Sequence, residues 1–413
     1  MGCATAVFKP GSIHNVRFLD RAESQSDEDV RVTVAVLSAE ESKELFGVDL
    51  ARKGIQPVWL KVENHGDRPY HLMLAGVDPN HFSPLETSYA THAAFTKSSK
   101  REMEAYFKNM SFKNPIETNT AVSGFVFTNL DEGEKVVQVD LIGPERAKFF
   151  TFFLEVPGMK ADYLRVDFDS LYSEKDYVEL DESGLRASLE KLPCCTTSVD
   201  GTELGDPLNL VIVGDFQDVA AAFARRGWLP AEETYSTAVK KTIKSYLFGS
   251  RYRDSPVSSL YFYGRHQDLA RQKPRRSIHE RNHLRLWLSP MRFEGKPVWV
   301  GQISRDIGVR FTVKTWPPVT HKIDPEVDEA RASLVEDLLL SQTVEKVGFV
   351  KGVGRATAAR PRENLTGDPY YTDGLRAVLL LGRFPKPLTV IQSFEWEKPK
   401  FVRFLDVSDT NKD

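Results

Sequence analysis

The stretch HLRLWLSP, His283–Pro290, decides the fold of the C-terminal half of this chain. Every second residue in it is a leucine, and the residues between the leucines are His283, Arg285 and Trp287. A period of two residues predicts a β-strand whose successive side chains point to opposite sides. We expect the leucine side to face a layer of helices. The other side then carries polar and aromatic side chains, which a solvent-exposed antiparallel sheet face would also do.

The segments around this strand complete an α+β pattern. Asp215 and Gly227 have the residue types that begin and end helices. The order that we expect is a strand over 209–213, helices over 215–227 and 234–249, strands over 258–265, 283–290 and 297–306, a helix from Pro325, a strand over 343–354 and two strands after Gly367. This order predicts an α+β sandwich with helices on one face of a mostly antiparallel sheet.

The N-terminal half has a different texture. Valine-rich and aromatic runs of strand length alternate with turns at 65–67 and 131–133, and helical segments are few. This pattern predicts a β-sandwich, for which we expect an immunoglobulin-like topology. The chain as a whole is therefore expected to be an α+β multidomain protein. The boundaries that we expect are a tether over 1–27, a β-sandwich domain over 28–160, an acidic connector over 161–205 and the α+β domain over 206–413.

Composition excludes several classes of protein. The 413 residues carry a net charge of −3, which argues against a dedicated nucleic-acid surface. No segment approaches the roughly 20 apolar residues that a membrane-spanning helix needs. Three cysteines cannot form a disulfide framework. Cys194 and Cys195 are adjacent, a poor geometry for a bond to each other, and we interpret them as buried small hydrophobic residues or free thiols.

The first residues, MGCATAVFKPGS, resemble the start of a mature bacterial lipoprotein, in which a cysteine precedes a short tether. We therefore expect a lipid anchor on Cys3, a membrane surface as partner and an extracytoplasmic location in the cell envelope. The rival interpretation is eukaryotic dual acylation of Gly2 and Cys3. The myristoylation pattern asks for Ser or Thr at position 6, where this chain has Ala6.

The pentapeptide HERNH, His279–His283, matches the HExxH pattern of zinc proteases. That pattern requires a helix, because both histidines must then lie on one face. Here it runs into the alternating strand, on which two residues four positions apart lie roughly 13 Å from each other. We interpret the match as accidental.

THKIDPEVDEARASLVEDLLL, Thr320–Leu340, places a histidine and several acids directly before an apolar helix. Asp324 before a proline fits a helix N-cap, and the acids after it suit the positive end of the helix dipole. Capping does not account for His321. The residues that could converge as ligands of a divalent metal, or as a general acid/base cluster, are His283, Asp306, His321, Asp324 and Asp328.

Between about Asp206 and about Val350 the chain contains, in this order, the segments PLNLVIVGD, SPVSSLYFYGRHQDLARQKP, RNHLRLW, KPVWVGQISRDIGV and THKIDPEVDEARASLVEDLL. On these segments the C-terminal half resembles the LssY-type C-terminal domain, a bacterial family. It departs at Lys322, where a second histidine is common, which weakens the metal interpretation. The family carries no settled activity over to this chain. The resemblance implies that the polar positions include Arg265, Gln267, Asp268, Gln272, Lys273, His283, Arg285, Asp306, His321, Asp324 and Asp328.

The residues support two hypotheses about function. In the first, which we favour, a lipid-tethered envelope protein binds an anionic envelope ligand or a protein partner through Arg265, Lys273 and Arg285, with Gln267, Asp268 and Gln272 beside them. In the second, the chain is a hydrolase that uses the five His and Asp residues as a metal or acid/base cluster. Convergence of those five side chains around one pocket would discriminate between the two hypotheses.

Overall fold

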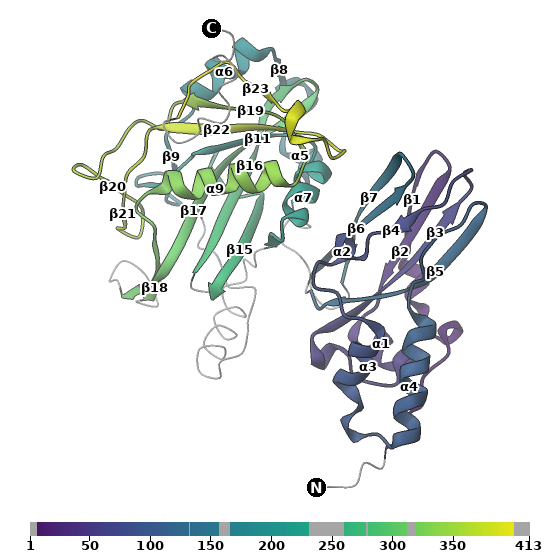
Figure 1. Ribbon diagram of the computed structural model, residues 1–413. Coiled ribbons are helices and arrows are strands. Elements are labelled where there is room, and N and C mark those ends of the chain that lie inside the picture. Colours follow the sequence, from purple (N-terminus) through teal and green to yellow (C-terminus); the bar gives the residue numbers. More distant parts are fainter. Residues whose placement is uncertain are drawn as a thin grey trace, which may run out of the picture. The chain divides into compact units, whose positions relative to one another are not determined.

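In the computed structural model the chain divides into two compact units, Met1–Ala161 and Asp162–Asp413 (Figure 1). The structure describes residues 6–131, 133–156, 166–230, 260–277, 280–311 and 319–399. Three expectations lie outside these residues: the lipid-bearing Cys3, the helix over 234–249 and the first histidine of HERNH. Among the residues described, no helix has both the length and the apolar character that crossing a membrane requires.

The first unit is a sandwich of two antiparallel sheets. One sheet has the order β1-β2-β3-β5 and the other the order β4-β6-β7. The strands are β1 (Glu23–Asp27), β2 (Val30–Val36), β3 (Ile55–Asn64), β4 (His71–Leu72), β5 (Thr120–Asn129), β6 (Glu134–Gly143) and β7 (Arg146–Glu155). Alternate residues such as Val32 and Val34 on β2 meet Val139 on β6 and Phe152 on β7 in one buried core. Period-two burial of this kind is what a sheet with one covered face requires.

The expected sandwich is present, but its strand order differs from that of an immunoglobulin domain. In an immunoglobulin domain the third strand crosses to the second sheet. Here β1, β2 and β3 are consecutive neighbours in one sheet, and their register runs unbroken from Glu23 opposite Val34 to Val36 opposite Val58. The strand runs in the sequence give the number and spacing of strands, but not which sheet each one joins.

Helices gather at one end of this sandwich around a second core (Figure 1). Phe46, Phe107, Phe125 and Phe127 pack there through stacked and edge-to-face ring contacts. The expected capping box is present, because Ser38 and Glu41 bond each other's backbone N–H groups. The helices are α1 (Ala39–Phe46), α2 (Leu74–Val77), α3 (Pro84–Thr91) and α4 (Lys97–Met110), with 3-10 turns η1 (Ile13–Asn15), η2 (Arg17–Arg21), η3 (Ala51–Lys53) and η4 (His92–Ala94).

The structure differs from the expected tether over residues 1–27. Phe8, Val16 and Phe18 are buried in the helical core, and Phe18 contacts both Trp59 and Phe125. β1 within the same stretch pairs with β2 along its whole length. Although most of this stretch is polar, the burial of Phe8, Val16 and Phe18 attaches it to the first unit.

Among the described residues of the second unit, the largest sheet has ten strands, mostly antiparallel, in the order β12-β15-β16-β17-β11-β22-β19-β23, with β8 on β16 and β18 on β17. Its strands are β8 (Val178–Leu180), β11 (Leu210–Val213), β12 (Leu229–Pro230), β15 (Leu269–Ser277), β16 (Glu280–Phe293), β17 (Lys296–Phe311), β18 (Val319–Ile323), β19 (Val344–Lys351), β22 (Leu375–Leu381) and β23 (Gln392–Ser393). The expected strands over 209–213, 283–290, 297–306 and 343–354 lie in this sheet, as do the two after Gly367. The single strand expected over 258–265 is wrong, because the described part of it forms a hairpin of Tyr261–Phe262 and Arg265–His266, with Tyr263 and Gly264 at positive φ between them, in a separate sheet. The chain is thus a mixed α+β protein with several mostly antiparallel sheets.

Two helices lie on the leucine side of β16, as the alternation predicts. The helices are not confined to this face, however, because α6 (Glu182–Lys191) packs on the opposite one, beside Val211 and Val300. Figure 1 shows α9 (Val327–Leu340) lying across the sheet, with α7 (Phe216–Arg225) near it. Trp299, which is opposite Leu288 in the register, contacts Phe216 at the start of α7. Lys273, opposite Asn282, bonds Asp337 of α9. Because register partners share a face, both contacts place the helices on the side of Leu284, Leu286 and Leu288.

Residues 166–205, which were expected to form a connector, contribute several elements to the second unit. β8 pairs in parallel with β16, and Leu185 and Leu189 of α6 are buried with Val211 and Val300. The elements here are α5 (Phe168–Leu171), η6 (Glu174–Asp176), β8, α6 (Glu182–Lys191) and β9 (Cys195–Thr197). The remaining elements are β10 (Leu204–Pro207), β13 (Tyr261–Phe262), β14 (Arg265–His266), β20 (Arg362–Glu363), β21 (Pro369–Tyr370) and η7 (Leu388–Val390).

Candidate functional site

The face of the large sheet that does not carry α7 and α9 holds a row of buried polar side chains. In the register of β15, β16 and β17, Gln272 lies opposite His283, and His283 opposite Ser304. Arg285 lies opposite Gln302, two residues further along the strands, so this pair points to the same face. All five are at most 6% exposed. The period-two expectation for this face is therefore confirmed, but the face is buried and not solvent-exposed.

Three further residues extend this row toward the end of the strands. Arg281 precedes His283 by two positions, Asp306 follows Ser304 by two, and β18 brings His321 alongside β17. We use the name polar cluster for the eight residues Gln272, Arg281, His283, Arg285, Gln302, Ser304, Asp306 and His321.

His283 is the centre of the polar cluster. Its Nε2 lies 2.9 Å from Oδ1 of Asp306 and 3.2 Å from Oγ of Ser304. Its Nδ1 lies 3.3 Å from Nη1 of Arg285. Because a guanidinium group only donates hydrogen bonds, we assign Nδ1 as the acceptor and Nε2 as the nitrogen that carries the proton toward Asp306.

Asp306 is a buried carboxylate that interacts with three side chains. Besides His283, Nε of Arg281 donates to its Oδ2 at 3.2 Å, and Nδ1 of His321 lies 3.5 Å from the same oxygen. Burial alone would raise the pKa of the Asp306 carboxyl, but the interactions with His283, His321 and Arg281 lower it well below its ordinary value. Asp306 therefore stays ionised throughout the physiological pH range.

The two arginines of the cluster also donate to amide oxygens. Nη1 of Arg285 donates to Oε1 of Gln302 at 2.8 Å, and Nη1 of Arg281 donates to Oε1 of Gln272 at 2.6 Å. Nε2 of Gln302 donates in turn to Ser304 at 2.8 Å, which links Arg285 back to His283. The network is continuous, so a change at any one side chain affects the orientation of the others.

This geometry differs from that of a serine hydrolase. A catalytic triad needs the serine on one imidazole nitrogen and the carboxylate on the other. Here Ser304 and Asp306 share Nε2 of His283, and Arg285 occupies the Nδ1 side. Within the described ranges, no group of three or more His, Cys, Asp and Glu side chains is placed so that it could hold a metal ion. What the cluster offers chemically is a set of fixed donors and one well-oriented imidazole.

The five residues of the proposed His/Asp cluster separate into two places. His283, Asp306 and His321 converge, whereas Asp324 and Asp328 belong to the start of α9. Asp324 is not the N-cap that the sequence predicts, because α9 begins at Val327 and its N-cap is Glu326, which makes no side-chain cap bond. Instead Oδ1 of Asp324 accepts from the backbone N–H of Glu326 at 3.1 Å, a local turn that delays the helix.

Asp328 has a structural role at the first turn of α9. It accepts from Thr372 Oγ1 at 2.8 Å and from the backbone N–H of Asp373 at 2.6 Å, and it lies 3.2 Å from Arg331. Burial raises the pKa of the Asp328 carboxyl above its ordinary value, although Arg331 opposes the shift. These contacts fasten α9 to the loop before β22, on the other face of the sheet from the polar cluster.

Two of the candidate ligand-binding cations form internal ion pairs. Arg265 makes a bidentate pair with Asp268, at 3.0 and 2.9 Å, and also donates to the carbonyl of Leu288. Lys273 reaches Asp337 at 2.7 Å on the helix side. Gln267 is buried beside Asp268. Of the three cations in the sequence hypothesis, only Arg285 lies in the polar cluster.

Sequence reasoning missed Arg281 and left Gln302 and Ser304 out of the candidate site. The signal for all three was present, because Arg281 lies two residues before His283, and Ser304 and Gln302 lie two and four residues before Asp306. Arg281 was left out because the strand was expected to begin at His283, whereas β16 begins at Glu280. The early start of β16 also agrees with reading HERNH as an accidental match, although His279 itself lies outside the described residues.

Residues 188–375 match the family model described as LssY C-terminus. The second unit therefore contains an LssY-type C-terminal domain. The match begins inside α6 and ends at the first residue of β22, so it is longer at both ends than the resemblance over 206–350. It spans the whole polar cluster. A search of curated proteins found no match.

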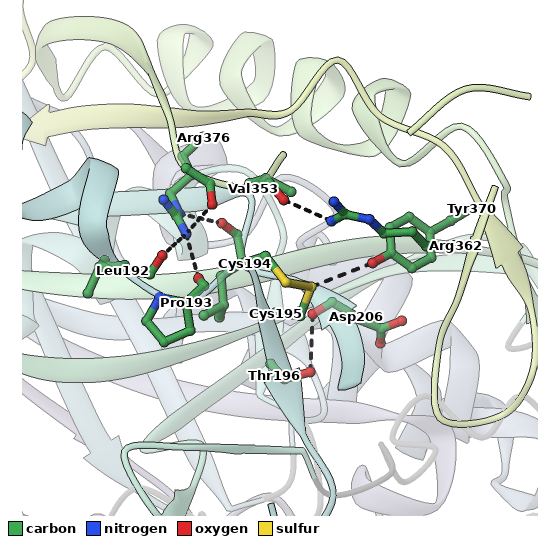
Figure 2. Close-up of a disulfide and its surroundings, with 12 residues drawn as sticks. Leu192, Pro193, Cys194, Cys195, Thr196, Asp206, Val353, Arg362, Tyr370 and Arg376 are labelled. Carbon is green, nitrogen blue, oxygen red and sulfur yellow. Dashed lines mark hydrogen bonds between the residues drawn. A yellow bond between two sulfur atoms is a disulfide. The ribbon is translucent and has the colours of Figure 1, made fainter. Parts of the chain in front are cut away.

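The LssY-type domain also contains a disulfide that the sequence analysis did not expect. Cys194 and Cys195 are bonded to each other, which corrects their interpretation as free thiols. Figure 2 shows the disulfide beside Tyr370, whose hydroxyl lies 3.6 Å from Sγ of Cys195. The bond between these two adjacent residues lies at the start of β9, of which Cys195 is the first residue.

Arg376 holds the chain on the other side of this disulfide (Figure 2). Its guanidinium is fully buried and donates to the carbonyls of Leu189, Leu192, Pro193 and Leu208. Burial lowers the pKa of Arg376 to about 10. Carbonyl oxygens from α6 and the segment after it therefore solvate one buried charge, and this binds residues 189–208 to β22.

Proposed function

We propose that this chain is a cell-envelope lipoprotein whose LssY-type domain binds an anionic ligand at the polar cluster. The observation that carries the proposal is the composition of the cluster. The cluster contains two arginines and two histidines but a single carboxylate, Asp306. The same sheet face is apolar at Trp287, Val298 and Val300. With both histidines neutral, the charge of the eight residues is two positive and one negative, or +1.

Stability alone does not account for these residue types. Taking charged groups out of water costs several kcal/mol each, and well-packed apolar residues in place of a buried ion pair are often as stabilising or more so. Recognition does account for them, because oriented guanidinium groups match the geometry of phosphate and carboxylate oxygens. Gln272 and Gln302 hold the two guanidinium groups in place before a ligand arrives.

Two features support an envelope location. Gly2-Cys3 followed by small residues fits a lipid-anchored N-terminus. The Cys194–Cys195 disulfide supports an oxidising compartment, since disulfides persist mainly outside the cytosol. The ligand would then be an anionic envelope component, or an acidic segment of an envelope protein.

A hydrolase is the second candidate function. The observation that favours it is the position of Asp306 between His283 and His321, an arrangement that can orient an imidazole as a general base. It would need a nucleophile, such as water, that approaches His283. Turnover of p-nitrophenyl phosphate that falls in His283→Ala would support this alternative.

Thermal unfolding of the full chain in the presence of small anions tests the proposal. Inorganic phosphate and glycerol 3-phosphate should raise Tm, and glycerol, which has no charge, should not, because a ligand stabilises only the state that binds it. Arg285→Gln, or Arg285→Lys if the first variant does not fold, should lose the rise. The matched control is Arg265→Gln, which removes an arginine already paired with Asp268 and should keep the rise. An equal rise in both variants would contradict binding at the cluster.

A further inference from the structure

The first unit exposes an unusual combination of side chains where α3 and α4 meet. Val7, Leu85 and Tyr89 are 61%, 54% and 73% exposed, and Lys97, Lys100 and Arg101 follow on the first turns of α4. We use the name α3–α4 rim for these six residues. Leu85 and Tyr89 are four positions apart on α3, so they share one side of that helix.

Direct contacts connect the two ends of this rim. The ring of Tyr89 lies 4.6 Å from that of His92 in η4. Ala94 of η4 accepts from the backbone N–H of Ala6, and Thr96 donates to the carbonyl of Ala6. Val7 follows directly. The apolar side chains, the start of α4 and the N-terminal segment therefore lie together.

The position of Ala6 decides what this rim faces. Cys3 precedes Ala6 by three residues, and three residues of fully extended chain span at most about 10 Å. A lipid on Cys3 would hold Ala6, and with it the Val7 end of the α3–α4 rim, close to a membrane surface, whatever path residues 3–5 take.

The charges of the rim fit the same partner. α4 has no acid in its first turn and carries Lys97, Lys100 and Arg101 near its start, where the helix dipole disfavours cations. By contrast, α1 and α3 both have acids in their first turns. The acids nearest to these cations in sequence are Glu102 and Glu104 on α4, with Glu104 three and four positions after Arg101 and Lys100. Glu86 on α3 bonds the backbone of Ser83 in a capping box. Lys97 and Arg101 are exposed and Lys100 is half-buried. Cations beside exposed apolar side chains suit a surface with anionic headgroups over acyl chains.

We infer that the α3–α4 rim is a membrane-contact surface that seats the first unit on an anionic phospholipid bilayer. This inference rests on the proposed lipid anchor, and it adds the orientation that the anchor alone does not supply. Tyr89 and Leu85 would enter the interfacial region, where tyrosine is enriched. Lys97, Lys100 and Arg101 would meet lipid phosphates.

Vesicles with the protein coupled through Cys3 test the inference without depending on acylation in the cell. Because Cys194 and Cys195 are joined, Cys3 is the cysteine left for coupling to a maleimide lipid. Hydrogen exchange of residues 84–101 should slow several-fold on vesicles of phosphatidylcholine with phosphatidylglycerol, relative to the soluble chain. The protection should be lost in the triple variant Lys97→Glu, Lys100→Glu, Arg101→Glu.

A matched triple variant, Lys43→Glu, Arg52→Glu, Lys53→Glu, changes three exposed cations elsewhere on the same unit and should keep the protection. Equal exchange on vesicles and in solution, or equal loss in both triple variants, would overturn the inference. The anchor itself is tested separately, because membrane fractionation of cells that express Cys3→Ser reports acylation and not the rim. Unchanged membrane association of that variant would reject the anchor and leave the vesicle result standing.

Discussion

Asp306 is the residue on which the polar cluster depends. It is 1% exposed, and its two oxygens interact with His283, Arg281 and His321. Without this carboxylate, one arginine and one imidazole N–H would remain buried with poorer partners. The cluster therefore couples the protonation of one acid to the orientation of the groups that we expect to meet a ligand.

Asp306→Asn should cost about 3–5 kcal/mol of unfolding free energy at neutral pH, because it leaves buried Arg281 without its carboxylate. The difference from wild type should shrink in acid. A carboxyl with a lowered pKa in the folded state stabilises the protein above its unfolded pKa, about 3.9, and that stabilisation is lost as the pH falls toward the folded value. Urea unfolding from neutral pH down to about pH 3 measures both effects. A constant difference between the two proteins would contradict the assigned role.

The Cys194–Cys195 bond makes a prediction about thiol content. Unacylated protein prepared without reductant and then denatured should show one reactive thiol per chain, and three after reduction, since the sequence has three cysteines. Mass spectrometry after alkylation, with and without reductant, counts them. Three thiols without reductant would mean that the adjacent cysteines are free in solution, as the sequence analysis expected.

At this scale the sequence predicted the identity of the polar residues better than their partners. His283, Asp306 and His321 converge as expected, because strand period and chain order bring them together toward one end of β16, β17 and β18. The partners of Arg265 and Lys273 were not foreseen, since ion pairing with Asp268 and Asp337 depends on how the strand ends and where α9 lies. Asp324 fits a cap in sequence, but its bond to Glu326 moves the helix start by two residues.

Among the elements, α9 organises the helix side of the LssY-type domain. Asp328 and Arg331 tie its start to Thr372 and Asp373. Asp337, near its end, accepts from Lys273 of β15, from Arg226 at the end of α7 and from Nε1 of Trp228. The helix is thus fixed at both ends by charge-assisted bonds, with Leu334 and Val335 buried between them.

Asp337→Asn should lower the unfolding free energy by about 1–3 kcal/mol, because two cations and one indole N–H lose their shared acceptor. Glu336→Gln is the matched control, since Glu336 is the exposed neighbour on the same helix, and it should change the free energy by less than about 0.5 kcal/mol. Chemical denaturation of both variants makes the comparison. Equal effects would show that Asp337 does not fasten α9.

Strands were more predictable than helix boundaries and sheet membership. The alternation of leucines with other residues in His283–Pro290 predicts which side chains share a face, and the observed register agrees with this prediction. No local signal says that β3 stays beside β2, or that β8 reaches β16. Those pairings depend on long-range packing, so the immunoglobulin-like topology was expected from strand number alone and the order proved different.

The whole molecule consists of two units with separate cores. The sandwich core of the first unit joins residues from Val30 to Val156, and the main described core of the second joins residues from Leu185 to Phe394. The elements within 166–205 belong to the second unit, whereas the sequence suggested a solvated connector because acids are frequent there. Despite that acidic composition, the burial of Leu185 and Leu189 and the carbonyls that bind Arg376 attach this segment to the second unit.

A fragment that begins at Asp162 should therefore unfold in one cooperative transition, and a fragment that begins at Asp206 should be less stable. The shorter fragment lacks Leu185 and Leu189, whose burial contributes roughly 3–6 kcal/mol together, and the three carbonyls of Leu189, Leu192 and Pro193 that bind Arg376. Thermal unfolding followed by circular dichroism compares them. Equal midpoints would mean that residues 162–205 are a connector after all.

Calorimetric titration of the full chain with inorganic phosphate tests the central claim most directly, which is that the polar cluster is an anion-binding site. We expect saturable binding with one site per chain, weakened in Arg285→Gln and His283→Ala, and retained in Arg265→Gln. Absence of saturable heat in the wild type, or equal affinity in Arg285→Gln and the wild type, would contradict it.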